Sequence, residues 1–568
     1  MAIHILAILR TERSDDQDSL AHSITWRRDI KFEGYAVLDH QARRILDPSA
    51  AKDTSEIGGY PQSSPSTLQN MIGPFMLCAL AGALFASQEA SAACSSWSNR
   101  YQTNLKGVCV CNATQCDTVS NDYKNLIPGQ VGVYTSSKAG DRFAYKVVNV
   151  DANAATNPTY TIDVSTQYQT MIAAINVYKL SSTLQQMVLD QYFSEKGLQY
   201  SLGRVTIGST DFSTSIYSYN DNPGDLAQEK FSIDVDRKSN KIDLIQRALR
   251  TSTRDVKLFA SSWAPPAWMT TENTTINCAL IGKPGEEYWR SLALYYSKFL
   301  DAYKTEGIDF WAMTVQNEPT KSILQTSAWQ SLRMSAELDL GPTMAKNHPG
   351  LKIIAGDDQK SGILDELAPF QDADALKYIS GLGVHWYRNL DFFFFGIGGD
   401  FDKLLTFHNK FPDIFMLATE ARGSVSEDED KSWSRAENYG RDIIEDINNF
   451  GGPNWAKNFV DAPILVDEVS GSEFYKQPMF YIMGHFSKFV PAGSRRIEFP
   501  KTKTLSNFHR TAFVTPDNNV VLQFLNRDNS DVTVSIKQSD AKTFTLKLPG
   551  HSMQTVILPA SDTTKIQV

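Results

Sequence analysis

The chain has 568 residues, of which 42% are hydrophobic, 11% aromatic and 21% charged, with 33 Gly and 23 Pro. This composition is typical of a globular protein and excludes a disordered, collagen-like or coiled-coil chain. The length predicts two or three domains, because single cores rarely grow beyond ~250–300 residues. The formal net charge is −9 at pH 7 and no basic run stands out, so we expect no nucleic-acid partner.

The first strongly apolar segment lies at residues 72–86, after a polar stretch without clear periodicity. It is too short to span a bilayer, which takes ~20 apolar residues. Met71 precedes it and Ala90-Ser-Ala92 follows it, which is typical of a signal peptide with an A-x-A cleavage site. We therefore expect residues 71–92 to be a secretory signal, translation to start at Met71 and residues 1–70 to be an extension of the gene model. An internal signal-anchor is the alternative.

Four cysteines follow the predicted cleavage site closely: Cys94, Cys109, Cys111 and Cys116. Such crowding predicts two disulfides in an oxidising compartment. A zinc site is the rival interpretation, but no His-x₃₋₅-His and no second Cys-x₂-Cys accompany them. Two sequons would accept N-glycans in the same compartment. They are Asn112-Ala-Thr114 and Asn273-Thr-Thr275.

Both ends of the chain beyond the signal have the pattern of short antiparallel strands. Val131, Val133 and Thr135 alternate with other residues near the start, as expected of a strand with one buried face. Near the end, apolar runs at 520–525, 532–536, 544–548 and 555–558 are separated by turn residues. Strands at both ends predict one β-sandwich, formed by residues 121–165 plus 490–568.

The middle of the chain alternates short apolar strands with helical stretches. Residues 292–303 carry apolar side chains at the spacing of one buried helical face. A (β/α)₈ barrel places its chemistry at the C-terminal ends of its strands, where polar and aromatic residues gather here. We predict a TIM barrel over residues 166–450 plus 476–489. Six of its eight strands are visible, at 201–207, 256–260, 310–315, 352–355, 382–384 and 414–418.

Two glutamates follow predicted strands. Glu318 comes after the strand in Trp311–Pro319, and Glu420 comes after the strand in Ile414–Arg422. If these are the fourth and seventh strands, the two carboxylates face each other across the barrel mouth, as glycoside hydrolysis requires. One carboxyl must then be protonated and the other ionised. For Glu318 considered alone, a solvated loop residue is the alternative.

Several longer strings of residues resemble the glucosylceramidases of glycoside hydrolase family 30. The resemblance extends from Cys94 to about Leu558 and is strongest to animal enzymes such as those of nematodes. It implies a TIM barrel, a sandwich, and a small disulfide-stapled β region at residues 93–120 with about 451–475. The matching strings are Cys109–Cys116, Asn317–Pro319, His385–Tyr387, Ala418–Glu420, Gly452–Trp455 and Phe474–Phe489.

The resemblance implies a β-glucosidase that hydrolyses glucosylceramide to glucose and ceramide with retention. Glu318 matches the general acid/base and Glu420 the nucleophile of the double displacement. Asn317 matches the residue that binds the sugar 2-hydroxyl. Tyr387 matches the phenol that orients the nucleophile, and His385 supports the same wall of the pocket.

Further pocket residues follow from the same resemblance. Arg204, Asp211 and Trp263 match residues that line the glucose pocket, and Asn458 matches a residue at its rim. A structural ion pair is the alternative role for Arg204, and plain core packing is the alternative for Trp263. We expect no metal and no cofactor, since His-Glu-x-x-His and nucleotide-binding motifs are lacking. The lack of Gly-x-Ser-x-Gly disfavours a serine hydrolase.

The resemblance also implies partners and a location. The partners would be glucosylceramide at a membrane surface, anionic lipid, a saposin-like activator and a lysosomal sorting receptor. The location would be the lysosome, reached through the secretory pathway, or the exterior of the cell, with peripheral attachment to membranes.

The chain departs from the family pattern at two barrel strands. Ile172 runs directly into Ala173, where the first strand is expected, and Phe450 joins Gly451, where the eighth is expected. A shorter stretch is lost between Lys321 and Leu340, and residues 391–399 resemble an insertion. Open barrel edges favour aggregation, so we hypothesise skipped exons in the gene model of an active enzyme. The alternatives are an inactive pseudoenzyme or another family-30 glycosidase.

Overall fold

The computed structural model describes most of the chain beyond residue 107. Predictions that concern residues 1–92, Cys94, Tyr387, 391–399 and Asn458, and those at the 172/173 and 450/451 junctions, lie outside the described residues. Within the described part, no helix is both long and apolar enough to cross a membrane. The described residues are 97–98, 108–150, 177–319, 327–333, 340–364, 367–385, 401–420, 429–445, 462–467, 470–497, 499, 507–538 and 542–559.

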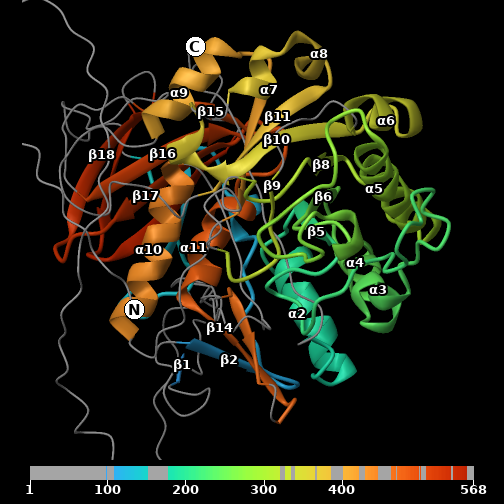
Figure 1. The fold of residues 1–568 in the computed structure, drawn as a ribbon. Coiled ribbons are helices and arrows are strands. Elements are labelled where there is room, and N and C mark those ends of the chain that lie inside the picture. Colours follow the sequence, from blue (N-terminus) through green and yellow to red (C-terminus); the bar gives the residue numbers. More distant parts are fainter. Residues whose placement is uncertain are drawn as a thin grey trace, which may run out of the picture. The chain divides into compact units, whose positions relative to one another are not determined.

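A parallel sheet of six strands forms the centre of the predicted barrel region (Figure 1). Every neighbouring pair in it is parallel. This half-barrel confirms the predicted α/β fold and the six strands. In sheet order the strands are β12 (Phe415–Glu420), β11 (Ile379–His385), β10 (Lys352–Gln359), β8 (Ala312–Thr314), β6 (Lys257–Ser262) and β5 (Leu202–Ile207).

Helices cover the outer side of this sheet. The predicted helical face is confirmed in α5 (Glu287–Thr305), where the tyrosines, Phe299 and both leucines of the pattern are buried. This face packs against Val205 and Ile207 of β5. The other helices here are α2 (Ser182–Phe193), α3 (Asp234–Lys238), α4 (Lys241–Thr251), α6 (Leu340–Asn347), α7 (Ala368–Gln371), α8 (Ala373–Leu376), α9 (Phe401–Lys410), η2 (Ala267–Met269) and η3 (Lys360–Gly362).

The inner side of the half-barrel is layered. Strand residues alternate between faces with a period of two. Leu202, Phe259, Ala312, Ile354 and Leu417, from five different strands, form one apolar cluster. Two positions further along three of these strands are Arg204, Ser261 and Thr314, all buried and polar. The apolar layer is therefore the floor of a polar site at the C-terminal ends of the strands.

A second, antiparallel sheet joins the two ends of the chain. Strand β20 pairs with β17 on one side and with β3 on the other, which confirms a sandwich built from both ends. The sheet order is β15 (Arg495–Ile497), β16 (Phe508–Val514), β17 (Val520–Asn526), β20 (Ser552–Leu558), β3 (Gln130–Ser137) and β4 (Ala144–Asn149). The second layer is the hairpin of β18 (Val532–Gln538) and β19 (Lys542–Leu548).

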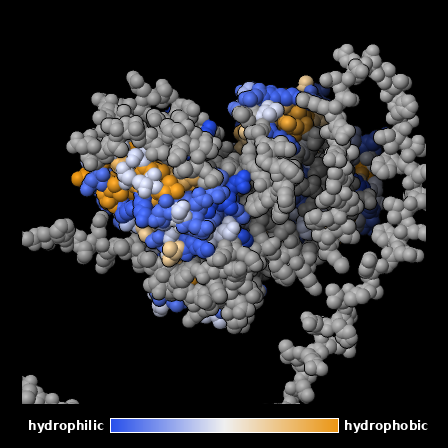
Figure 2. Space-filling model, turned by 90° about the vertical axis from the view of Figure 1, so that its left-hand side faces the viewer, coloured by the Kyte–Doolittle hydropathy of each residue, from blue (hydrophilic) through white to orange (hydrophobic). Residues whose placement is uncertain are grey.

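The sandwich sheet buries both faces. One face packs its valines and leucines against Val534, Ile536 and Phe544 of the hairpin. The other face lies against α10 (Glu429–Glu445) and α11 (Pro478–Ser487). On the side of the protein shown in Figure 2, hydrophilic residues cover much of the described surface, with smaller hydrophobic patches among them.

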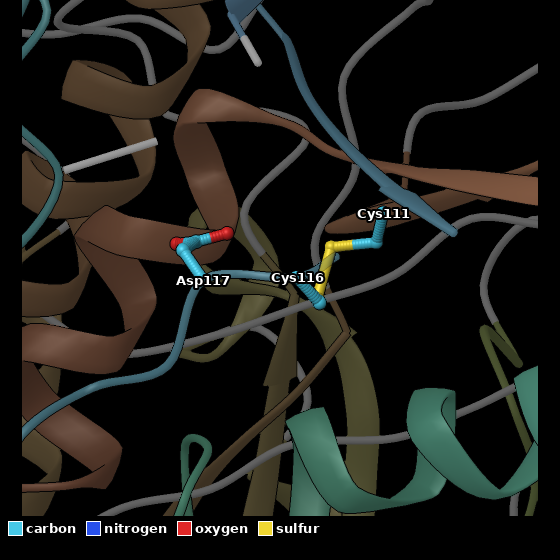
Figure 3. A group of neighbouring side chains, drawn as sticks. All are labelled: Cys111, Cys116 and Asp117. Atoms are coloured by element: carbon cyan, nitrogen blue, oxygen red, sulfur yellow. A yellow bond between two sulfur atoms is a disulfide. The ribbon is translucent and has the colours of Figure 1, made fainter. Parts of the chain in front are cut away.

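A small sheet at the base combines the start of the chain with a late segment. Its order is β1 (Trp97–Ser98), β2 (Val108–Asn112), β14 (Glu473–Lys476) and β13 (Ile464–Val466). Cys111 of β2 forms a disulfide with Cys116, and Asp117 lies beside it (Figure 3). Cys109 is also disulfide-bonded, and its partner lies outside the described residues. The remaining short elements are η1 (Asp122–Asn125), β7 (Cys278–Ala279) and β9 (Leu332–Arg333).

Candidate active site

Glu318 occupies a strained position just beyond β8. Its backbone has φ 43°, in the left-handed region, which costs a residue other than glycine roughly 1–2 kcal/mol. Its N–H donates to the carbonyl oxygen of Asp357, 2.9 Å away, and Asp357 itself has φ 60°. Such strain persists only where the surrounding contacts impose it, and it is concentrated at functional sites.

Two donors converge on one oxygen of the Glu318 carboxyl. The Gln359 Nε2 lies 2.9 Å from Glu318 Oε1, and the His385 Nδ1 lies 3.3 Å from the same atom. All three residues are buried. The acid/base candidate is thus held by the ends of β10 and β11 as well as by its own loop.

Glu420 is held from the opposite side of the sheet. It is the last residue of β12, and an irregularity in the pairing of β11 with β12 places it opposite His385. Arg204 of β5 donates from one guanidinium nitrogen to Glu420 Oε2 at 2.6 Å. The Arg204 side chain is fully buried, whereas 15% of the Glu420 side chain is exposed. The nucleophile candidate is therefore accessible to a ligand while its charge is paired.

Asp357 connects the two halves of the site. Its Oδ2 lies 2.6 Å from the second guanidinium nitrogen of Arg204 and 2.9 Å from the Ser261 hydroxyl. Its Oδ1 lies 3.1 Å from the His385 Nε2. A continuous chain of contacts thus runs from Glu318 through His385, Asp357 and Arg204 to Glu420.

The charges of this chain are mutually stabilised. Burial by itself lowers the pKa of His385, but the negative charge of Glu420 and the hydrogen bonds to Asp357 and Glu318 outweigh it and raise the pKa to about 10. Burial tends to raise the pKa of Asp357, but the Arg204 charge and His385 hold it well below its usual range. At neutral pH the site therefore contains two buried cations, Arg204 and His385, around an ionised Asp357.

The spacing of the carboxyl groups bears on the chemistry. An oxygen of Glu318, an oxygen of Glu420 and a ring nitrogen of His385 all lie within 4.8 Å of one another. Retaining glycosidases hold their two carboxyl groups ~5–5.5 Å apart, and inverting enzymes hold them ~6.5–9.5 Å apart. The spacing also suits a metal ion. However, an imidazolium whose two nitrogens both donate to carboxylates has no lone pair for a metal.

Two further predicted pocket residues adjoin Arg204. The Asn317 Oδ1 accepts from Arg204 at 2.9 Å, and the Trp263 ring centroid lies 4.8 Å from the guanidinium carbon. Asp211 is buried in the loop that follows β5. The structure thus brings six predicted residues into one site: Arg204, Trp263, Asn317, Glu318, His385 and Glu420.

Several residues of this site were not predicted from the sequence. Asp357, Gln359, Ser261 and Thr314 all lie near strand ends and all are buried. The available signal was a predicted strand followed by Asp357-Asp-Gln359, but β10 extends through these residues. A strand rich in polar residues at its C-terminal end is the pattern that could have identified them.

The hydrogen bonds of the two sequon asparagines go to residues outside this network. Asn273 is exposed in a turn with φ 49°. Asn112 is half-buried at the end of β2, and its Oδ1 accepts from the backbone and the hydroxyl of Thr114.

Comparison with known proteins identifies the family. Residues 166–490 match the glycosyl hydrolase family 30 TIM-barrel domain, and residues 493–556 match the family 30 beta sandwich domain. The lysosomal acid glucosylceramidase of Mus musculus is 35% identical over 489 residues, which cover 79% of this chain and 93% of the mouse protein.

Solved structures have the same fold. SrfJ from Salmonella typhimurium aligns with a TM-score of 0.68 and 26% identity, covering 76% of this chain and 99% of that one. The endo-beta1,6-glucanase BT3312 aligns with a TM-score of 0.65 and 22% identity, covering 76% of this chain and 99% of that one. The fold, the paired carboxyl groups and both domain matches agree, and the chain belongs to glycosyl hydrolase family 30.

Proposed function

We propose that this protein is a retaining β-glucosidase that hydrolyses glucosylceramide to glucose and ceramide. The observation that carries the proposal is the approach of Glu318 and Glu420 to within 4.8 Å, which favours a covalent intermediate over direct attack by water. The choice of glucosylceramide is supported by the mouse relative, a glucosylceramidase of 35% identity. The proposed setting is an acidic compartment of the secretory pathway, with the lipid presented at an anionic membrane surface.

In the first step, Glu318 donates its proton to the glycosidic oxygen while a carboxylate oxygen of Glu420 attacks C1 of the glucose. The C1–O bond to ceramide breaks, ceramide leaves as its alcohol, and glucose is held as an ester of Glu420. Arg204 fixes one oxygen of Glu420 for this attack. It also stabilises the ionised carboxylate before the ester forms.

In the second step, the now ionised Glu318 accepts a proton from water, and the water oxygen attacks C1. The ester bond breaks, glucose is released with its original anomeric configuration, and both carboxyl groups regain their starting states. His385 and Gln359 donate to Glu318. Hydrogen bonds to a carboxylate favour its charged form, so these donors support Glu318 as the base.

The two glutamates can be tested separately. We expect Glu318→Gln and Glu420→Gln each to lower kcat for an aryl β-glucoside, by ~10²-fold or more for the acid/base. Azide should restore turnover in Glu318→Gln alone, with β-glucosyl azide as the product, because the glucosyl ester still forms when the leaving group is good. Wild-type turnover that gives α-glucose first, followed by proton NMR, would contradict the retaining mechanism.

Two further measurements distinguish the proposed function from its alternatives. Another family-30 activity predicts higher kcat/KM for aryl xyloside, aryl fucoside or β-glucan than for glucosylceramide in vesicles containing phosphatidylserine. A pseudoenzyme predicts that folded protein takes no covalent label on Glu420 from a cyclitol epoxide, read by peptide mass spectrometry. We expect label on Glu420 in the wild type and none in Glu420→Gln.

A further inference from the structure

Gln359 is a buried residue whose side chain contacts the candidate acid/base Glu318. It is the last residue of β10, and its own N–H donates to the Asp358 carboxylate at 2.8 Å. Its Nε2 donates to Glu318 Oε1 at 2.9 Å, while its Oε1 is buried without a hydrogen-bond partner among the described residues. The amide is therefore oriented by Glu318, since the opposite orientation would set two acceptor oxygens against each other.

His385 supplies the second donor to the same oxygen. Its Nε2–H is directed to the Asp357 carboxylate at 3.1 Å, and its Nδ1 lies 3.3 Å from Glu318 Oε1. With the pKa of His385 raised to about 10, both ring nitrogens carry protons and both donate. A carboxylate oxygen has two lone pairs in the plane of the group. Gln359 and His385 together occupy those of Oε1.

We propose that Gln359 is a positioning residue for the acid/base: with His385 it reserves Oε1 of Glu318 as an acceptor, so that Oε2 carries the catalytic proton. This inference rests on the proposed function. A proton on Oε1 would displace one of the two donors and leave it buried and unpaired, which is costly. The same donors stabilise the carboxylate that remains once Oε2 has given its proton to the leaving oxygen.

Four charged groups lie around Glu318: the His385 donor favours its ionised form, whereas the negative charge of Glu420 opposes it. His385 on β11 contacts it directly, and Asp357 on β10 accepts its N–H through the backbone. Glu420 on β12 lies within 4.8 Å, and Arg204 on β5 neutralises Glu420 and Asp357. Of the two donors to Glu318 Oε1, His385 is charged and Gln359 is neutral. Replacing it therefore changes the hydrogen bonding of Glu318 without changing the net charge of the site.

The test compares Gln359→Met with the wild type on aryl β-glucosides whose leaving groups differ in basicity. For poor leaving groups, which need the proton, kcat/KM should fall by about 10- to 100-fold, the effect of one hydrogen bond to a charged group. For 2,4-dinitrophenyl glucoside, which leaves without protonation, kcat/KM should stay near the wild-type value. The alkaline limb of the pH profile should move up by about one unit, because ionised Glu318 loses a donor.

Gln330→Met is the matched control. Gln330 is another buried glutamine, but it donates to the Ser209 hydroxyl at 2.8 Å. Its substitution should change kcat/KM by one common factor for every leaving group and leave the alkaline limb in place. If Gln359→Met does not fold, as judged by its thermal transition, Gln359→Glu takes its place, since an ionised Glu of the same shape cannot donate and should move the limb further upward.

The proposed function and the positioning role of Gln359 fail in different ways. Wild-type protein without activity on any β-glucoside would overturn the proposed function. A folded Gln359→Met that loses activity equally for all leaving groups, with an unmoved alkaline limb, would overturn the positioning role alone. The role also has a readout without turnover: the infrared titration of the Glu318 carboxyl, assigned by its loss in Glu318→Gln, should move to higher pH in Gln359→Met, and no movement contradicts it.

Discussion

Asp357 is the residue on which the polar contacts of the active site converge. It accepts from Arg204, Ser261 and His385, and its side chain is fully buried. Two of these partners are cations that no longer contact water. Removing one member of a buried ion pair is far more costly than removing a surface pair, because the remaining charge stays buried without compensation. Asp357 therefore contributes to stability and to the geometry of both catalytic carboxyl groups.

We predict that Asp357→Asn lowers the free energy of unfolding by ~3–5 kcal/mol and greatly reduces kcat/KM. Urea denaturation and aryl β-glucoside hydrolysis measure the two effects. Asp117→Asn is the control, because Asp117 is also a buried carboxylate, 2.6 Å from Lys476, but belongs to the small sheet region. It should lose comparable stability while its folded fraction keeps near wild-type kcat/KM. Unchanged kcat/KM in Asp357→Asn would show that Asp357 does not fix the geometry of the two catalytic carboxyl groups.

Helix α11 is the element that holds the sandwich against the rest of the protein. Nine of its residues, from Pro478 to Phe486, are buried, so the helix is apolar all round rather than on one stripe. Its one imidazole, His485, is fully buried between the hydroxyls of Thr555 on β20 and Ser136 on β3, each 2.8 Å away. A hydroxyl therefore satisfies each nitrogen of the neutral ring.

His485 makes the stability of this element dependent on pH. Burial lowers the pKa of His485 to about 3, whereas an unfolded histidine titrates near ~6.5. Between these two pH values His485 is protonated in the unfolded chain but neutral in the folded one. Its contribution to stability is therefore fully present above about pH 6.5 and is lost as pH falls toward 3. We predict that His485→Gln removes a slope of up to ~1.4 kcal/mol per pH unit in this window, measured by denaturation from pH 4 to 7.

Thr555→Val is the control for this slope. It removes a hydrogen-bond partner of His485 without removing the titrating ring, and it should lower stability by a similar amount at every pH. An identical pH slope in wild type and His485→Gln would show that His485 does not govern the effect. The contribution of His385 to stability depends on pH in the opposite direction, because the pKa of His385 is raised to about 10. This contribution is fully present below about pH 6.5 and is lost as pH rises toward 10.

At the level of the whole protein, the two ends of the chain complete a single sheet. Strands β3 and β4 precede the half-barrel in sequence, yet β3 obtains its second neighbour from β20 near the C-terminus. The same sheet covers α11 with Tyr134, Val521 and Ile557. The region matched by the beta sandwich domain, residues 493–556, is therefore not an independent appendage of the described fold.

We predict that ending the chain at residue 491 yields insoluble or protease-sensitive protein. β3 would keep β4 but lose its second partner, β20, and α11 would lose the apolar face that covers it. This would leave an open strand edge and an exposed hydrophobic surface. Limited proteolysis and sedimentation measure this. Removal of residues 1–92, the predicted extension and signal, is the control and should preserve the thermal transition. A soluble, cooperatively folded chain ending at 491 would show that the rest of the fold does not depend on the C-terminal strands of this sheet.

The sequence by itself determined the features that depend on local pattern. The six strands, the buried face of α5 and the positions of Glu318 and Glu420 after strands all follow from periodicities of two or 3.6 residues and from turn residues, which neighbouring residues impose. The family resemblance added the pocket residues Arg204, Trp263 and Asn317. Both kinds of information place a residue on an element without stating what its side chain contacts.

Only the tertiary structure decided which groups touch. Asp357 and Gln359 lie in β10, where the pairing with β11 is irregular beside a left-handed residue. Likewise, Glu420 faces His385 only because the pairing of β11 with β12 shifts by a residue. Such shifts depend on the neighbouring strand, which is distant in sequence and leaves no local signal. The charge network that links the two glutamates therefore arises from the packing of five strands and could not be derived from any one of them.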